Sequence, residues 1–183
     1  MDASEQMMEG APANEIALEQ VFRLHYPRLV GLLARITGDR GRAEELAAEV
    51  FCRLSGRPAL FGQGTNLDGW LHRTAVNLGL DCLRMEARRR KNEQAAGVEI
   101  TRAGGAGGPL DDLLRSEERT RVKRVLTALK PSSANLLLLR HAGMSYAQLA
   151  EALQIRRASV GKLLARATAD FERRYRSLYG SEL

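Results

Sequence analysis

The chain has 183 residues, of which 44% are hydrophobic and 5% aromatic, a composition that suits one or two small soluble domains. Its net charge of +6 indicates a polyanionic partner such as nucleic acid or an anionic membrane surface. No apolar run approaches the roughly 18 residues of a membrane span, and the N-terminal stretch MDASEQMMEGAPANE is too acidic and polar for a secretory signal. We therefore expect a cytoplasmic protein that does not insert into membranes.

The first predicted helix follows a polar segment. Residues 1–13 are expected to form a flexible tail. Asn14 can cap a helix that extends to about Thr37, with Gly38 as the stop signal. Pro27 lies inside this range and is expected to kink the helix or to split it, because proline lacks a backbone donor and clashes with the preceding turn.

Two further helices complete an N-terminal block over residues 14–91. Apolar periodicity predicts one helix over about Arg40–Ser55 and another over about Leu67–Lys91, joined by the connector GRPALFGQGTN. Residues 92–109 are rich in Gly and Ala and lack apolar periodicity, so we predict a flexible linker there.

A C-terminal block over residues 110–183 contains the stretch YAQLAEALQIRRASVGKLLARA, which indicates two short helices with a break around Gln154. Since no strand pattern competes anywhere, we predict an all-α fold of two small helical domains joined by a flexible linker, with a helix-turn-helix in the second. The helices expected in this block are Leu110–Leu129, Ser133–His141, a short helix capped by Ser145, and a last helix that ends near Tyr179.

The helix predicted over Leu67–Lys91 has two distinct faces. One is an apolar stripe, and the other gathers cations and an amide within an arc of about 80°. Such a face suits phosphate contacts and base edges; the alternative is a solvated face, with basic residues favoured at a helix C-terminus. The stripe comprises Leu67, Leu71, Thr74, Ala75, Leu78, Cys82 and Met85, and the polar arc comprises Arg73, Asn77, Asp81, Arg84 and Arg88.

The helix predicted over Arg40–Ser55 carries two exposed acids, Glu45 and Glu49, one turn apart. Like charges at this spacing cost a few tenths of a kcal/mol, and a basic partner for this surface would offset that cost. The alternative is neutralisation within the helix by Arg42 and Arg53. The residues predicted to face inward are Ala43, Ala47, Val50 and Leu54.

The last predicted helix is also two-faced. Its inward stripe is opposed by small residues interspersed with long cations, a surface that can approach a duplex closely. In a helix-turn-helix the second helix enters the major groove by its N-terminal residues, here Arg156 to Lys162; the alternative is a solvated basic face. The inward stripe comprises Val160, Leu164, Ala167 and Phe171, and the opposite face comprises Ala158, Lys162, Ala165, Arg166, Ala169, Arg173 and Arg176.

The cysteines and histidines form no recognisable site. Cys52 and Cys82 have no CxxC spacing, and we expect both to be small buried hydrophobes. His25, His72 and His141 each stand without a partner at metal-ligand spacing. Because a Gly-rich phosphate loop, a nucleophile elbow and a metal-binding carboxylate cluster are also lacking, we predict no catalytic residues, no metal and no cofactor, and a protein that is not an enzyme.

Taken together, these segments resemble bacterial sigma factors, specifically the extracytoplasmic-function (ECF) group of the sigma-70 family. The N-terminal block contributes HYPRLVGLLARITGDRGRAEELAAEVFCRL and WLHRTAVNLGLDCLR, and the C-terminal block contributes YAQLAEALQIRRASVGKLLARA. Each motif is moderately specific, and their ordered combination over most of the chain is strong.

The resemblance implies that the N-terminal block binds the promoter −10 element and the clamp coiled coil of core RNA polymerase. It implies that the C-terminal block binds the −35 element and the polymerase flap, and that an anti-sigma factor is a further partner. By position, Glu45 and Glu49 would meet the polymerase, and the arc from Arg73 to Arg88 would contact −10 DNA. Phe61, in the connector, would form one wall of a pocket for a flipped base, or would simply plug the core. The implied −35 contacts are Arg156, Arg157, Ser159, Lys162 and Arg166.

Several positions depart from the family pattern. Arg42 stands where an acidic residue is usual and Ala48 where Gln is usual, which weakens the expected acidic surface. Gln154 replaces the usual turn glycine and must adopt a positive φ or reshape the turn. Gly161 and Leu163 stand where cations are usual. These changes affect the promoter sequence that would be read rather than the fold.

The leading hypothesis is a sigma factor that recruits core polymerase and helps to open the −10 region. A second hypothesis, supported by Arg42 and Ala48, is a helix-turn-helix regulator that binds DNA without engaging polymerase. A third is a sigma-like decoy that sequesters an anti-sigma factor. The second apolar side of the Leu67–Lys91 helix (Val76, Leu80 and Leu83) would serve such a partner, face polymerase or pack within its own domain.

Overall fold

The computed structural model describes residues 3–62, 64–95 and 109–180. Throughout these ranges every regular element is helical, which confirms the all-α prediction. In chain order the elements are α1 (Ala3–Thr37), α2 (Arg40–Ser55), the 3₁₀ turn η1 (Pro58–Phe61), α3 (Leu67–Ala95), α4 (Pro109–Ala128), α5 (Pro131–His141), α6 (Tyr146–Leu153) and α7 (Arg157–Tyr179). None of the helices in the described residues is long and apolar enough to cross a bilayer.

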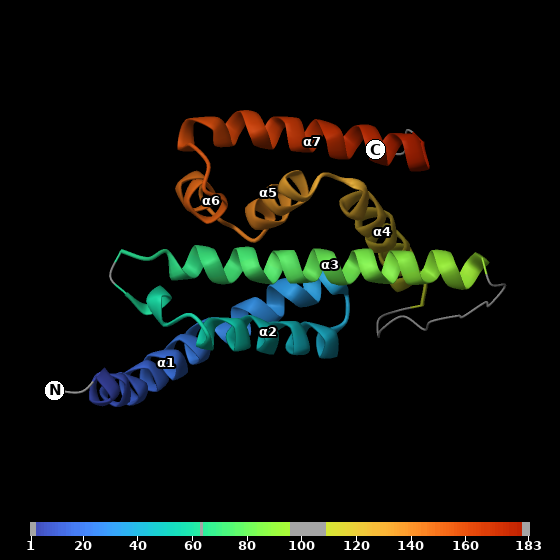
Figure 1. Ribbon diagram of the computed structural model, residues 1–183. Helices are drawn as coiled ribbons and strands as arrows, with labels where there is room; N and C mark the ends of the chain where they lie inside the picture. Colours follow the sequence, from blue (N-terminus) through green and yellow to red (C-terminus); the bar gives the residue numbers. More distant parts are fainter. Residues whose placement is uncertain (1–2, 63, 96–108, 181–183) are drawn as a thin grey trace.

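Helix α3 lies between the two halves of the chain (Figure 1). On one side it packs on α1 and α2. On the other side α4, α5 and α6 pack against it, and α7 packs on these three helices. We call α1 to α3 the N-terminal block and α4 to α7 the C-terminal block. Most of the predicted linker, residues 96–108, lies outside the described residues, while residues 92–95 continue α3.

Helix α1 differs from its prediction in two respects: where it begins, and that it continues through Pro27. It begins at Ala3 instead of Asn14, so residues 3–13, expected as a tail, continue the helix. The sequence there is rich in Ala, Glu, Gln and Met, which are strong helix formers. The helix is not split at Pro27. Pro27 and Arg23, whose carbonyl loses its helical partner, are both exposed, so water can satisfy that carbonyl.

Helix α2 has the predicted bounds, and its inward residues are confirmed. Asp39 begins the helix in an extended conformation, and its carboxylate accepts a hydrogen bond from the backbone N–H of Arg42 at 2.9 Å, a standard N-cap. All four residues predicted to face inward are fully buried: Ala43, Ala47, Val50 and Leu54. Cys52 is exposed, contrary to prediction, because it lies off this stripe, whereas Cys82 of α3 is buried.

Helix α3 is buried on two faces. Leu71, Ala75 and Cys82 belong to a hydrophobic cluster made entirely within the N-terminal block. Val76, Leu80 and Leu83 belong to a second cluster, which also contains residues from α1 and from all four C-terminal helices. Met85, predicted to be on the apolar stripe, is 56% exposed, because the helix extends past the end of the first cluster there.

Helices α6 and α7 form the predicted pair with a tight break. Ser145 accepts a hydrogen bond from the backbone N–H of Gln148, and the Gln148 side chain accepts one from the Ser145 N–H, a complete capping box. Gln154 adopts the left-handed conformation (φ 55°, ψ 44°). Gln154 therefore preserves the turn geometry that glycine usually provides, and its own backbone is strained as a result.

Two of the three histidines share one carboxylate, which the sequence did not indicate. His25 of α1 and His72 of α3 place their Nδ1 atoms 3.4 and 3.3 Å from Asp68 Oδ1. His25 Nδ1 is buried and makes no hydrogen bond. Burial lowers the pKa of His25 below 6.5; the Asp68 charge opposes this shift, and His72 and Arg28 add to it. Within the described residues, no three His, Cys, Asp or Glu side chains gather as a potential metal site.

Replacing the strained turn residue is expected to stabilise the fold. Gln154→Gly should raise the free energy of unfolding by about 0.5–1 kcal/mol, since glycine adopts positive φ without steric cost. Urea denaturation measures the change. Ala169→Gly, at an exposed position inside α7, is the matched control and should lower stability by about 1 kcal/mol. A loss of stability in Gln154→Gly would contradict the assignment of strain to this residue.

Stability should also depend on pH through His25. As the pH falls below about 6.5, the unfolded chain takes up a proton on His25 before the folded chain does. The free energy of unfolding should therefore decrease until the pH passes the lower pKa of the folded state. Urea titrations across this range should show a weaker dependence in His25→Gln. His141→Gln, at an exposed position, should behave like the original chain, and an equal pH dependence in all three proteins would refute the role of His25.

Candidate nucleic-acid interface

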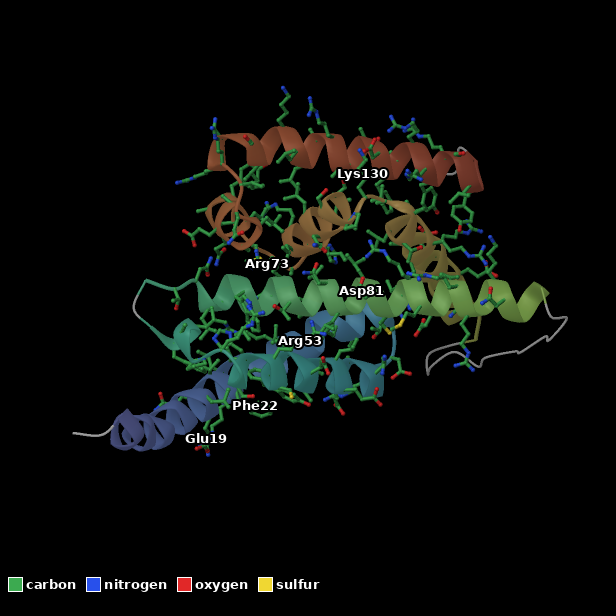
Figure 2. The ribbon with its side chains drawn as sticks, in the orientation of Figure 1. Glu19, Phe22, Arg53, Arg73, Asp81 and Lys130 are labelled. Carbon is green, nitrogen blue, oxygen red and sulfur yellow. The ribbon has the colours of Figure 1, made fainter. Side chains whose placement is uncertain are left out.

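The polar arc of α3 is present as predicted, and we call it the α3 strip: Arg73, Asn77, Asp81, Arg84 and Arg88. Asn77, Asp81 and Arg88 are exposed and Arg73 is half-buried. In Figure 2, Arg73 lies between α3 and the C-terminal helices. The side chain of Arg84 is only 20% exposed, and its Nη1 lies 3.1 Å from Asp81 Oδ1. The strip therefore contains one internal ion pair and is not a fully solvated face.

The C-terminal block lies directly against this strip. Asn135 of α5 donates a hydrogen bond from Nδ2 to Asn77 Oδ1 at 2.7 Å. Arg84 Nη2 is buried without any acceptor, beside a hollow that Thr127 and Ala128 of α4 help to line. The side chain best suited to read a base edge is thus engaged by the protein itself, and Arg84, although paired with Asp81 through Nη1, keeps one guanidinium nitrogen without an acceptor.

Phe61 lies in η1, between α2 and α3. It is half-buried and packs against the hydrophobic cluster of the N-terminal block. This packing agrees with a role for Phe61 in closing the core. Because the side chain is only half-buried, part of the ring also remains accessible to a base.

The acidic pair of α2 is exposed but internally paired. Glu45 Oε2 lies 2.6 Å from Arg42 Nη1, and Glu49 Oε1 lies 3.0 Å from Arg53 Nε. This is the intrahelical neutralisation considered as the alternative. Arg42 is further held by Cys82, since its Nε lies 3.4 Å from the Cys82 sulfur. Because the partners of both pairs are 40–66% exposed, each pair is worth at most about 1 kcal/mol.

The cations of the α6–α7 pair face solvent. Arg156, Arg157, Lys162 and Arg166 are all exposed, and among the described residues none of them has an ion-pair or hydrogen-bond partner. Ser159 is half-buried. The predicted inward stripe is confirmed, with Val160, Leu164 and Ala167 buried and Phe171 packed at the edge of the core.

The side chains between these cations are small. Ala158, Ala165 and Ala169 are exposed between them. Gly161 is not required by packing, since a Cβ there would lie 3.7 Å from Tyr146, an ordinary contact. Helix α7 lies outermost, with α5 and α6 between it and α3 (Figure 1). Its cationic face is therefore open to an approaching polyanion while the α3 strip is partly covered.

The contacts between the two blocks were missed by sequence reasoning. Lys123 of α4 donates a hydrogen bond to the backbone carbonyl of Thr37 at 2.5 Å, and Asn66 Nδ2 donates to Glu151 Oε2 of α6 at 3.0 Å. Together with the contact of Asn135, these bonds join residues 58 to 86 positions apart. No local pattern marks such residues, because each one is an ordinary polar residue on an amphipathic helix.

Comparison with known proteins shows similarity in sequence and similarity in fold. Residues 21–89 match the family described as sigma-70 region 2. Over 70 residues the chain is 36% identical to the ECF RNA polymerase sigma factor SigE of Mycolicibacterium smegmatis, a match that covers 38% of this chain and 27% of that protein. The fold is similar to that of the sigma factor RpoE in its co-crystal structure with the anti-sigma factor NepR from Bartonella quintana. That match has a TM-score of 0.51 and 20% identity, and covers 85% of this chain and 94% of the other.

Proposed function

Because residues 21–89 match sigma-70 region 2 and the chain is 36% identical over 70 residues to an ECF sigma factor, we propose that it is a sigma factor of the ECF group that binds core RNA polymerase and directs it to promoters. The observation that carries the proposal is the outward face of α7. Four exposed cations at its N-terminal half have no side-chain partner within the described residues, on a chain whose residues 21–89 match sigma-70 region 2: Arg156, Arg157, Lys162 and Arg166. Unpaired cations on one helix are the electrostatic signature of a polyanion-binding surface.

Helix α7 is proposed to read the −35 element. The capped α6 and the left-handed turn at Gln154 fix the angle at which α7 is presented. The N-terminal end of α7, with Arg156, Arg157 and Ser159, would reach base edges in the major groove. Lys162 and Arg166 would hold phosphates, and the small residues between them permit close approach.

The α3 strip is proposed to contact the −10 element. Arg73, Arg84 and Arg88 supply cations for phosphates, and the Asn77 amide can pair with a base edge. Phe61 would stack on an unpaired base with the part of its ring that the core leaves accessible. The work is binding and DNA distortion rather than bond chemistry, so no cofactor is required.

Helix α2 is proposed to meet the clamp coiled coil of the polymerase through Glu45 and Glu49, and the C-terminal block to meet the flap. The exposed pairs with Arg42 and Arg53 are weak enough to be exchanged for basic residues of a partner. The solved relative was crystallised with an anti-sigma factor, and we extend such a partner to this chain. These activities would place the protein in the cytoplasm.

One observation favours a second function. Arg42 contacts both Glu45 and Cys82, so a positive charge stands beside the proposed polymerase surface. A helix-turn-helix regulator that binds DNA without engaging polymerase would tolerate this charge without difficulty.

Charge reversal on α2 separates the two functions. In promoter-library transcription with purified core polymerase, the original chain should give promoter-dependent transcripts. Glu45→Lys/Glu49→Lys should reduce both transcription and co-purification with core polymerase by about tenfold or more, because like charges then face the coiled coil. Glu44→Lys is the matched control, since Glu44 also pairs within α2, 3.0 Å from Arg40. Unchanged co-purification of the double variant would favour the regulator.

The α7 cations should make DNA binding depend on salt. Lys162→Ala and Arg166→Ala should each lower the slope of log affinity against log salt by about one for duplex DNA, as expected for one lost phosphate contact. Fluorescence anisotropy at several salt concentrations measures the slope. Arg173→Ala is the control, because Arg173 already pairs with Asp170 on the same helix. Equal slopes in all variants would place these cations in solvent.

A further inference from the structure

A hollow of about 500 Å³ lies where α1, the N-terminal end of α3 and the connection between α5 and α6 meet. Figure 1 shows α6 beside that end of α3. The volume falls within the range of roughly 300–1,000 Å³ that small-molecule sites occupy. The residues that line it belong neither to the surfaces proposed for DNA nor to the acidic pair of α2. The proposed function therefore leaves this hollow without a role.

Two arginines of α1 line the hollow. Arg28 and Arg35 are seven residues apart, so they lie on one face of the helix, two turns from each other. Both are exposed, and among the described residues neither guanidinium group has an acceptor. A guanidinium group binds a phosphate or a carboxylate through two parallel hydrogen bonds. This wall of the hollow therefore suits an anion.

A third donor comes from α6. The Oε1 atom of Gln148 accepts a hydrogen bond from the backbone N–H of Ser145 at 2.8 Å, which fixes the orientation of the amide. The amide nitrogen of Gln148 has no acceptor among the described residues, and Gln148 lines the hollow. The capping box that begins α6 thus also holds a hydrogen-bond donor ready for a ligand.

The hollow is open partly because two of its lining residues have no side chain. Gly31 lies between the two arginines on α1, and a Cβ there would have no neighbouring atom within 4 Å. The same is true of Gly143, which also has a positive φ of 94°. Glycine weakens the interior of a helix, and no close packing requires it at Gly31. Its structural effect is to keep this space free.

One carboxylate restricts what the hollow can bind. Asp68 lines it, with Oδ1 at 3.4 and 3.3 Å from the Nδ1 atoms of His25 and His72. A bare anion is repelled by this carboxylate, whereas a hydroxyl group can donate to it. His72 Nδ1 lies 2.9 Å from the backbone carbonyl of Asp68 and must carry the proton, because a carbonyl only accepts. In the neutral ring Nε2 is then a second acceptor for a hydroxyl group.

Apolar side chains complete the lining. Pro27 and Leu32 of α1 and Met144, which precedes α6, border the hollow. They suit the carbon skeleton of a ligand, and a methionine sulfur also makes favourable contacts with aromatic rings. The lining therefore combines donors for an anion, acceptors for hydroxyl groups and a smaller apolar part.

We propose that this hollow binds a small phosphate ester that carries hydroxyl groups, the chemistry shared by sugar phosphates and nucleoside monophosphates. The two guanidinium groups match the charge of about −2 that a phosphate monoester has near neutral pH. The phosphate lies between Arg28 and Arg35 and accepts from Gln148, and the hydroxyl groups face Asp68 and His72. The site does not rest on the proposed function, because it uses none of the residues assigned to DNA or polymerase.

Calorimetric titration of the full chain tests the site with two probes, adenosine 5′-monophosphate (AMP) and ribose 5-phosphate. Saturable binding to one site is expected. Tighter binding of AMP would assign nucleoside monophosphates, and equal affinities would assign sugar phosphates. Adenosine, which lacks the phosphate, should not bind. Absence of saturable binding for both probes would overturn the proposal, and so would inorganic phosphate that binds as tightly as the esters, since the site would then hold an adventitious ion only.

Arginine variants test the wall of α1. Arg28→Gln and Arg35→Gln should each weaken binding of the better probe by about tenfold or more, because each removes charge-assisted hydrogen bonds to the phosphate. Arg157→Gln is the matched control, since Arg157 is an exposed arginine of α7 and the net charge changes equally. It should leave the affinity unchanged. Equal weakening in all three variants would show that the probe responds only to net charge.

Filling the hollow gives an independent test. Gly31→Leu extends a side chain into the open space and should abolish binding, whereas Gly31→Ala adds one methyl group and should retain affinity within about threefold. Neither variant should melt at a lower temperature than the original chain, since both residues favour a helix more than glycine does. Full affinity in a folded Gly31→Leu variant would overturn the location. If that variant does not fold, the arginine variants carry the test. Failure of the proposed function would appear separately, as absent polymerase-dependent transcription with binding of the probe intact.

Discussion

The structure depends on the burial of α3 from two sides at once. Adjacent residues of this helix, Ala75 and Val76, belong to different hydrophobic clusters. The close approach of α1 to α3 is possible because Gly79 has no side chain: a Cβ there would lie 3.0 Å from a methyl group of Ile36. Once both faces are occupied, the strip is one of the surfaces left between them for polar side chains. The position of the strip at the seam between the blocks is thus a consequence of packing.

The two cationic surfaces differ in how far the protein compensates them. On α3, Asp81 neutralises Arg84, and Asn135 engages Asn77. On α7 Arg157, Lys162 and Arg166 remain uncompensated among the described residues, whereas Arg173 pairs with Asp170. An uncompensated surface attracts a polyanion at long range, whereas a compensated one binds only after local rearrangement. A first encounter through α7 followed by engagement of α3 is the order that this difference in charge favours.

Local features of the fold could be read from the sequence because short-range chemistry determines them. The bounds of α2, the cap at Ser145 and the positive φ at Gln154 each depend on neighbours within a few residues. The predicted start of α1 was wrong: the helix continues through Asn14, Pro12 and Gly10 back to Ala3, although each of these residues favours a helix boundary. Cys52 was assigned to the interior from residue type alone, although its position on α2 lies off the buried stripe.

Part of the candidate site could be predicted because it also depends on short-range features of the sequence. Periodicity places the α3 strip and the α7 face correctly, because both are properties of single helices. It left the surface of Val76, Leu80 and Leu83 open among several partners, and the structure fills it with the C-terminal block. Bonds such as that from Lys123 to Thr37 span 86 residues, and only the three-dimensional arrangement reveals them.

The location of Lys123 has an evolutionary consequence. This residue belongs to neither of the surfaces proposed for DNA and does not lie on α2, yet it helps to hold the two blocks together. Substitutions at such a position change how firmly the blocks are joined while leaving the proposed recognition residues untouched. The contact between the blocks and the proposed recognition of DNA are then encoded by separate residues, so relatives can diverge in one while keeping the other.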